Sequence, residues 1–89
     1  MVESNIIIIN KLGLHARAAA KLVATAGAFG SSIKIGVRDK SVDGKSIMAV
    51  MMLAANKGTE ITVSCDGEDE QAALSAVLDI IFQRFGEAE

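Results

Sequence analysis

The stretch Lys11–Ala20, which reads KLGLHARAAA, joins the first expected strand to the first expected helix. A β-branched apolar run, Ile6–Ile9, precedes it, and its own alanine-rich end has high helix propensity. Gly13 can supply the permissive backbone angle that turns the chain from strand to helix. His15, the only histidine in the chain, therefore falls at or just before the first helical residue.

This position gives His15 an environment suited to anions. The first backbone N–H groups of a helix lack internal partners, and the helix dipole adds partial positive charge there. An anion at His15 would meet the amides of Ala16 and Arg17 and the Arg17 guanidinium. A neutral imidazole is also a nucleophile, and the combination is typical of phosphoryl transfer. The plainer alternative is a solvated histidine at a helix end.

Length and composition narrow the function classes. The 89 residues predict one domain, 1–89, that buries only about 60% of its unfolded surface. The net charge is −2 and nine Lys and Arg residues are spread along the chain, so no nucleic acid partner is expected. No Cys and His cluster has the spacing of a zinc site, and neither a metal nor a cofactor is expected.

The compartment can also be predicted. The longest apolar run, Ile47–Ala55, has nine residues, whereas about 20 are needed to span a bilayer, so no membrane association is expected. Glu3 stands where a signal peptide would carry positive charge. Cys65, the single cysteine, cannot form an internal disulfide. These features favour the reducing cytoplasm.

Periodicity and turn residues predict seven elements. In chain order they are a strand at Val2–Asn10, a helix at Ala16–Ala26, strands at Ser32–Arg38 and Ser41–Asp43, a short helix at Ile47–Leu53, a strand at Glu60–Cys65, and a final helix that begins at the acidic residues 68–70 and ends before Gly86. The alternating strands predict an α+β fold with an antiparallel sheet, open on one face and covered by three helices on the other. The first two strands, linked by a helix, would be parallel with the last strand between them, which is a split-βαβ arrangement.

The same patterns predict the buried faces. Alternation turns Ile33, Ile35 and Val37 inward in one strand and Ile61, Val63 and Cys65 inward in another. In the first helix we expect Ala19, Ala20 and Val23 on the buried side, with Ala16 and Leu22 as further candidates. The buried stripe of the last helix is expected to be Leu74, Val77, Leu78, Ile81 and Phe85. The four isoleucines of the first strand do not alternate, so the pattern leaves their orientation open.

Two motifs carry a resemblance to a known family. Gly13–Arg17, which reads GLHAR, and Gly44–Met48, which reads GKSIM, closely resemble HPr, the histidine phosphocarrier family of the bacterial phosphotransferase system. The likeness covers essentially the whole chain, including the order and spacing of the elements. It implies the open-faced β-sandwich of that family, with Ile6 and Ile8 turned inward and Ile7 and Ile9 outward.

The resemblance also implies the chemistry. His15 would accept a phosphoryl group on its δ1 nitrogen from the phosphohistidine of Enzyme I and pass it to IIA components of sugar permeases. Arg17 and the backbone amide of Ala16 would stabilise the phosphate, so the protein would be a carrier and not an enzyme. Two positions depart from the commoner family pattern, since Ala18 replaces a proline and Leu12 replaces a polar residue.

Ser46 and the methionine-rich segment after it each have two interpretations. Ser46 is either a helix N-cap or the serine that HPr kinase/phosphorylase modifies in many relatives. The apolar residues that follow are either core or a surface for several partners. By resemblance we expect Ala20, Ile47, Met48 and Met51 at the partner-binding surface, and Met52 and Leu53 in the core.

Other function classes remain open at this point. A regulatory protein that acts only through Ser46 is disfavoured, because relatives of that kind lack the histidine. A phosphocarrier of the nitrogen-related branch fits the same residues, and only its acceptor would distinguish it. A small domain whose helix end binds stray anions is the third alternative. In each case we expect a monomer.

Overall fold

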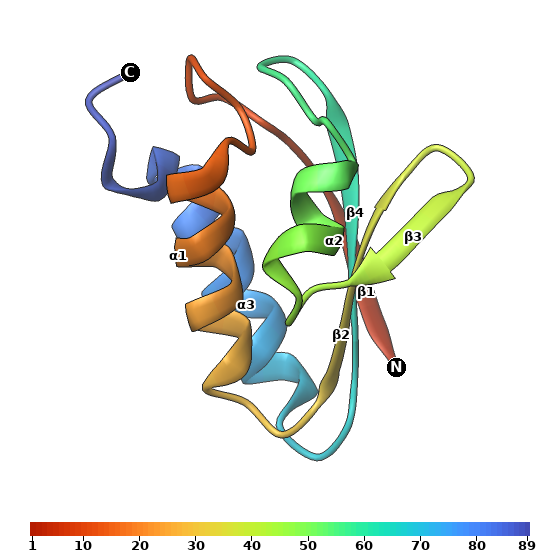
Figure 1. Ribbon diagram of the computed structural model, residues 1–89. Helices are drawn as coiled ribbons and strands as arrows, with labels where there is room; N and C mark the ends of the chain where they lie inside the picture. Colours follow the sequence, from red (N-terminus) through yellow and green to blue (C-terminus); the bar gives the residue numbers. More distant parts are fainter.

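The computed structural model describes residues 1–89, and its elements follow the predicted order (Figure 1). They are β1 (Val2–Ile7), α1 (Ala16–Gly27), β2 (Ser32–Val37), β3 (Lys40–Asp43), α2 (Ile47–Met52), β4 (Glu60–Asp66), α3 (Glu70–Phe82) and a 3₁₀ turn at Arg84–Gly86. None of the helices has the length and apolar character needed to cross a bilayer.

The four strands form one sheet in the order β1-β4-β2-β3. Every neighbouring pair is antiparallel, with Ile6 opposite Ile61 and Ile35 opposite Val63. Because β1 and β2 are both antiparallel to β4, they run parallel to each other on its two sides. The predicted split-βαβ topology is therefore confirmed.

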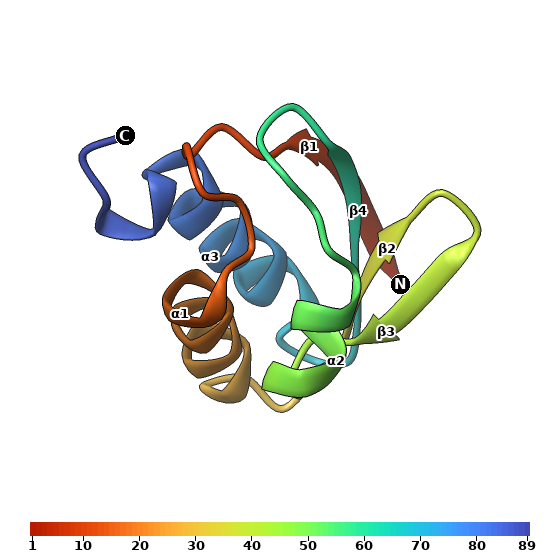
Figure 2. The same ribbon diagram turned by 45° about the horizontal axis from the view of Figure 1, so that its top comes forward.

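The helices all lie on one face of the sheet, and the core fills the space between the two layers (Figures 1 and 2). Ile33, Ile35 and the inward residues of β4 are buried there, as the alternation predicts. The opposite face is polar apart from the exposed Ile7, and on it Thr62 Oγ1 donates a 2.8 Å hydrogen bond to Asn5 Oδ1. The predicted open-faced sandwich is thus confirmed.

The first strand is shorter than predicted, ending at Ile7 instead of Asn10. Backbone pairing nevertheless continues to Ile8, which accepts from Gly58 N at 2.7 Å and donates to Thr59 O at 2.9 Å. Ile8 is fully buried and Ile6 half-buried, whereas Ile7 is exposed, so these inward and outward assignments are confirmed. Ile9 is only half-exposed.

One turn and one helix face differ from the predictions. The β2–β3 turn is Arg38–Asp39, so β3 begins one residue early at Lys40. The prediction that Ala20 is buried is wrong, because the buried stripe of α1 is Ala18, Ala19, Leu22 and Ala26. At 100° per residue this stripe turns Ala20 to the exposed side.

At the two remaining helices, the structure places Met52 and Phe85 differently from the sequence prediction. Met52 was expected in the core but is 67% exposed, while Leu53, just after α2, is buried as predicted. Phe85 is buried as expected, yet it lies outside α3, in the 3₁₀ turn. Arg84 and Phe85 both take left-handed backbone angles, with φ of 57° and 55°, and the chain kinks there after the end of α3.

Cys65 lies in the central strand β4, between Val2 of β1 and Ile33 of β2. Its side chain is fully buried, as predicted. Burial raises the pKa of the thiol, and the nearby carboxylates of Glu70 and Asp69 add to the effect. The thiol is therefore neutral and acts as a small apolar core residue.

Candidate functional site

A tight turn between β1 and α1 sets the position of the site. Buried Asn10 closes it, donating from Nδ2 to Gly13 O at 2.8 Å and accepting from Gly13 N at its own carbonyl at 3.2 Å. Gly13 has a φ of +65°, and a Cβ atom there would lie 2.8 Å from Asn56 Cα. Only glycine meets both conditions, as the sequence analysis anticipated for the backbone angle.

His15 is the N-cap residue of α1, with φ −74° and ψ 178°. Its carbonyl accepts the first intrahelical hydrogen bond, from Ala19 N at 2.8 Å. The N–H groups of Ala16 and Arg17 precede that bond and have no partner inside the helix. No acidic residue lies in this first turn. The predicted placement of the imidazole beside free amides at a helix N-terminus is therefore correct.

The site contains one residue that the sequence analysis missed, Glu87. Its Oε2 forms a short contact with His15 Nε2, and its Oε1 accepts from Asn10 Nδ2 at 3.0 Å. The His15 side chain is 28% exposed, because the C-terminal segment that carries Glu87 partly covers the imidazole. In Figure 1 that segment, in dark blue, runs beside the start of α1.

The charge state of Glu87 follows from its surroundings. Burial raises the pKa of this carboxyl, but hydrogen bonds from Asn10 and His15 and the charges of His15 and Arg17 outweigh it. The net effect lowers the pKa below the ordinary glutamate value. Glu87 is consequently an anion at neutral pH, even beside a half-buried imidazole.

Arg17 is exposed and makes neither a hydrogen bond nor a salt bridge. Together with His15, Ala16 and Glu87 it lines one surface pocket, along with Lys11, Leu12, Ala88 and Glu89. A guanidinium in this state keeps all its donors free for an incoming anion. The structure therefore brings together His15, Arg17 and the Ala16 amide.

Ser46 and α2 form a second predicted feature. Ser46 is the N-cap of α2, and its Oγ accepts from Ala49 N at 3.3 Å, which confirms the capping interpretation. The exposed apolar residues of this helix make up what we call the α2 surface: Ile47, Met48, Met51 and Met52. Helices α1 and α2 pack side by side (Figure 2), so the exposed Ala20 of α1 and the α2 surface belong to neighbouring helices.

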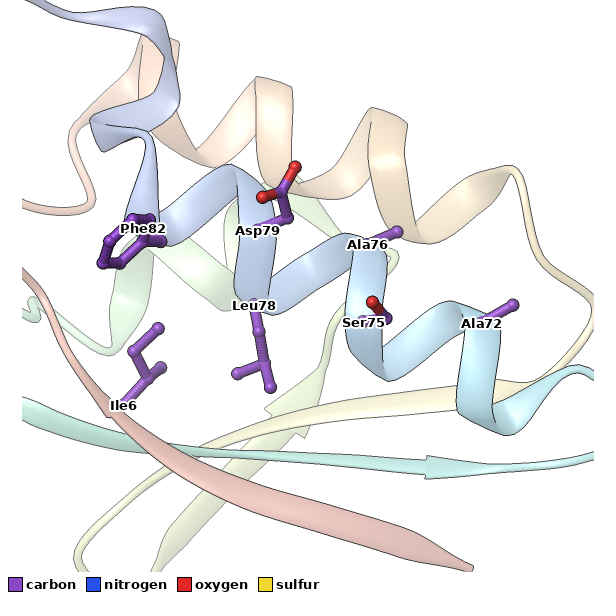
Figure 3. A pocket seen from close by; sticks show the side chains of 7 residues that line it. All are labelled: Ile6, Ala72, Ser75, Ala76, Leu78, Asp79 and Phe82. Carbon is purple, nitrogen blue, oxygen red and sulfur yellow. The ribbon is translucent and has the colours of Figure 1, made fainter.

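A different pocket lies between β1 and α3, lined by Ile6, Leu78, Phe82 and four smaller or polar residues (Figure 3). Figure 3 shows the Phe82 ring near Ile6, with Leu78 directed toward the sheet and Asp79 directed away. Asp79 is its only ionisable residue, and neither His15 nor Arg17 contributes. No group of three His, Cys, Asp or Glu side chains in the protein is arranged to hold a metal ion.

Comparison with known protein families identifies the family to which the chain belongs. The family model described as the PTS HPr component phosphorylation site matches residues 2–83. The chain belongs to the HPr family. It is thus a phosphocarrier protein of the phosphotransferase system rather than an enzyme, and phosphohistidine chemistry in sugar transport follows from that family.

Individual HPr proteins agree over the full length. The chain is 54% identical over 89 residues to the phosphocarrier protein HPr of Cupriavidus necator and 56% identical over 90 residues to that of Pseudomonas aeruginosa, with complete coverage of both chains in each case. The crystal structure of an HPr from Thermoanaerobacter tengcongensis superposes with a TM-score of 0.96, at 44% identity and full coverage of both chains.

Proposed function

We propose that His15 is the residue that carries the phosphoryl group in this HPr protein. The observation that carries the proposal is the N-cap position of the imidazole, beside the free amides of Ala16 and Arg17. A phosphoryl group on Nδ1 would meet partial positive charge at the helix N-terminus and full charge at Arg17. Few other groups would hold it, which suits a group that must be passed on.

The proposed relay has two transfer steps. The phosphohistidine of Enzyme I donates to His15, and the IIA components of sugar permeases then accept from it. The α2 surface and Ala20 would contact these partners, because methionine side chains adapt to differently shaped surfaces. We expect a monomer that acts in the cytoplasm, where the free thiol of Cys65 stays reduced.

Ser46 supports an additional regulatory role. Its side chain already caps α2, and a phosphate there would keep a negative charge at the helix N-terminus. The same charge would lie beside the α2 surface and slow the docking of Enzyme I by repulsion. HPr kinase/phosphorylase is the expected modifying enzyme. Mass spectrometry of protein isolated from cells would detect phosphoserine, and its absence under all nutrient conditions would argue against this role.

A direct phosphorylation assay tests the relay. The protein is incubated with phosphoenolpyruvate and Enzyme I, and its mass should rise by one phosphate in an acid-labile, base-stable form. His15→Ala should abolish this gain, and a gain that persists would remove His15 from the mechanism. Candidate IIA proteins are then added one at a time. A nitrogen-related acceptor as the only recipient would assign the chain to that branch instead of sugar uptake.

A further inference from the structure

The Glu87 carboxylate is fixed in the site by several contacts. Phe85, two residues before it, is fully buried, and its carbonyl accepts from Lys21 Nζ at 2.7 Å. Two residues after it, Glu89 O accepts from Lys11 N at 2.6 Å. The Glu87 side chain itself is only 16% exposed and accepts from Asn10, which is completely buried. The carboxylate is therefore held in place and is not a mobile tail group.

The chemistry of the contact fixes the direction of its hydrogen bond. An ionised carboxylate has only acceptors, so the hydrogen between Glu87 Oε2 and His15 Nε2 belongs to the imidazole. In a neutral imidazole the other nitrogen, Nδ1, then carries the free lone pair. Nδ1 has no hydrogen-bond partner in the protein.

We propose that Glu87 is a positioning residue for phosphoryl transfer, which keeps the proton of His15 on Nε2 and orients the ring so that Nδ1 is the nucleophile. This inference rests on the function proposed for His15. It assigns Asn10 a supporting role, because Asn10 Nδ2 holds the second carboxylate oxygen and thereby fixes the plane of the group.

The bonds and charges of the transfer step balance when the proton stays on His15 Nε2. The lone pair of Nδ1 forms a bond to phosphorus, while the bond between phosphorus and the donor nitrogen breaks and its electron pair returns to the donor. The Nε2 proton stays in place, so the phosphorylated ring is cationic and faces the Glu87 carboxylate. When the phosphoryl group leaves, the electron pair of the N–P bond returns to Nδ1 and the ring is neutral again.

The contact can be tested in the free protein, without any partner. In ¹H–¹⁵N NMR at a pH where the imidazole is neutral, an Nε2 proton bonded to a carboxylate exchanges slowly with water and gives an observable resonance. Glu87→Ala should abolish this resonance. Glu68→Ala, which removes an exposed carboxylate from the loop before α3, should preserve it. The proposal is overturned if the resonance is missing from the unmodified protein or survives in Glu87→Ala.

The role in transfer is tested with phosphoenolpyruvate and Enzyme I. Glu87→Ala should lower the rate at saturating carrier about tenfold, the factor typical of one charge-assisted hydrogen bond, and leave the KM unchanged. Glu68→Ala, which removes an exposed carboxylate outside this pocket, should match the unmodified protein. An unchanged rate in Glu87→Ala overturns the proposal, and a faster rate would identify Glu87 as an inhibitory occupant of the anion site. If the unmodified protein takes up no phosphoryl group, the proposed function fails, whereas the NMR result still reports the contact.

Discussion

Asp69, at the start of α3, accepts hydrogen bonds from both the backbone N–H and the hydroxyl of Ser31, at the start of β2. The N–H of Ser31 lies 3.0 Å from Asp69 Oδ1, and Gly30 N lies 2.9 Å from Oδ2. These bonds, led by the Ser31 hydroxyl, lower the pKa of Asp69. One carboxylate thus connects two segments 38 residues apart in the sequence.

This connection predicts a loss of stability in acid. Because the folded pKa lies below the unfolded value, the stabilisation is complete above about pH 4 and is lost as the pH falls through the folded pKa. In Asp69→Asn the amide nitrogen would face an N–H donor, so we expect lower stability at pH 7 and a flatter dependence between pH 5 and 2. Urea unfolding followed by circular dichroism measures the unfolding free energy at each pH. Parallel pH profiles for Asp69→Asn and the unmodified protein would contradict the prediction.

Gly13→Ala should destabilise the protein by about 2 kcal/mol or more, since it adds left-handed strain and a clash with the backbone of Asn56. Gly27→Ala is the matched control, because a Cβ there meets no atom within 4 Å and the residue is helical. We expect that change to stabilise by about 0.5–1 kcal/mol. Urea denaturation measures the unfolding free energy of both variants. Equal changes in Gly13→Ala and Gly27→Ala would contradict the prediction.

Arg17→Lys should reduce the rate of phosphoryl transfer roughly tenfold while leaving the unfolding free energy unchanged. Lysine keeps the charge but loses the planar donor pair, and the exposed arginine has no contact whose loss would affect folding. Transfer from Enzyme I and urea denaturation measure the two quantities. A rate equal to that of the unmodified protein would exclude the guanidinium from the mechanism.

Substitutions at Ser46 should separate capping from charge. Ser46→Ala removes the hydrogen bond to Ala49 N and should cost about 1 kcal/mol of unfolding free energy, with little effect on transfer. Ser46→Asp keeps a capping oxygen and adds a negative charge, so it should retain stability but slow the reaction with Enzyme I, most strongly at low salt. A salt-independent rate in Ser46→Asp would rule out repulsion as the cause.

Met48→Glu should raise the KM of Enzyme I for this protein about tenfold, by placing a charge in the α2 surface. Phe82→Glu is the matched control, because Phe82 is 71% exposed and Met48 72% exposed, on different helices. We expect the control to leave the KM unchanged. Similar changes in both variants would show that α2 has no special part in docking.

The sheet could be predicted from the sequence because its strands carry their own pattern. Ile33 and Ile35 alternate with exposed residues, and Ile61 and Val63 alternate with half-buried polar ones. A period of two needs only a few residues to be recognised. The N-cap position of His15 could be inferred for a similar local reason, since Gly13 and the alanines after it define where the helix starts.

The part of Glu87 in the site could not be predicted, because it depends on a contact between residues far apart in the sequence. Glu87 follows the last helix without any periodic pattern, and its contact with His15 spans 72 residues. Two consecutive left-handed residues, Arg84 and Phe85, direct it there, and neither residue type favours that conformation. Met52 was misplaced because α2 has only six residues, too few for helical periodicity to distinguish the buried side from the exposed one.

The buried thiol of Cys65 can report on transient opening of the core. A thiol-specific reagent can reach this side chain only when the core between the sheet and the helices opens. The rate of labelling would therefore report how often the centre of the molecule opens, in unmodified protein and without any engineered dye. Because the lone thiol allows a single labelling event per molecule, each reacted chain would be counted directly by its mass.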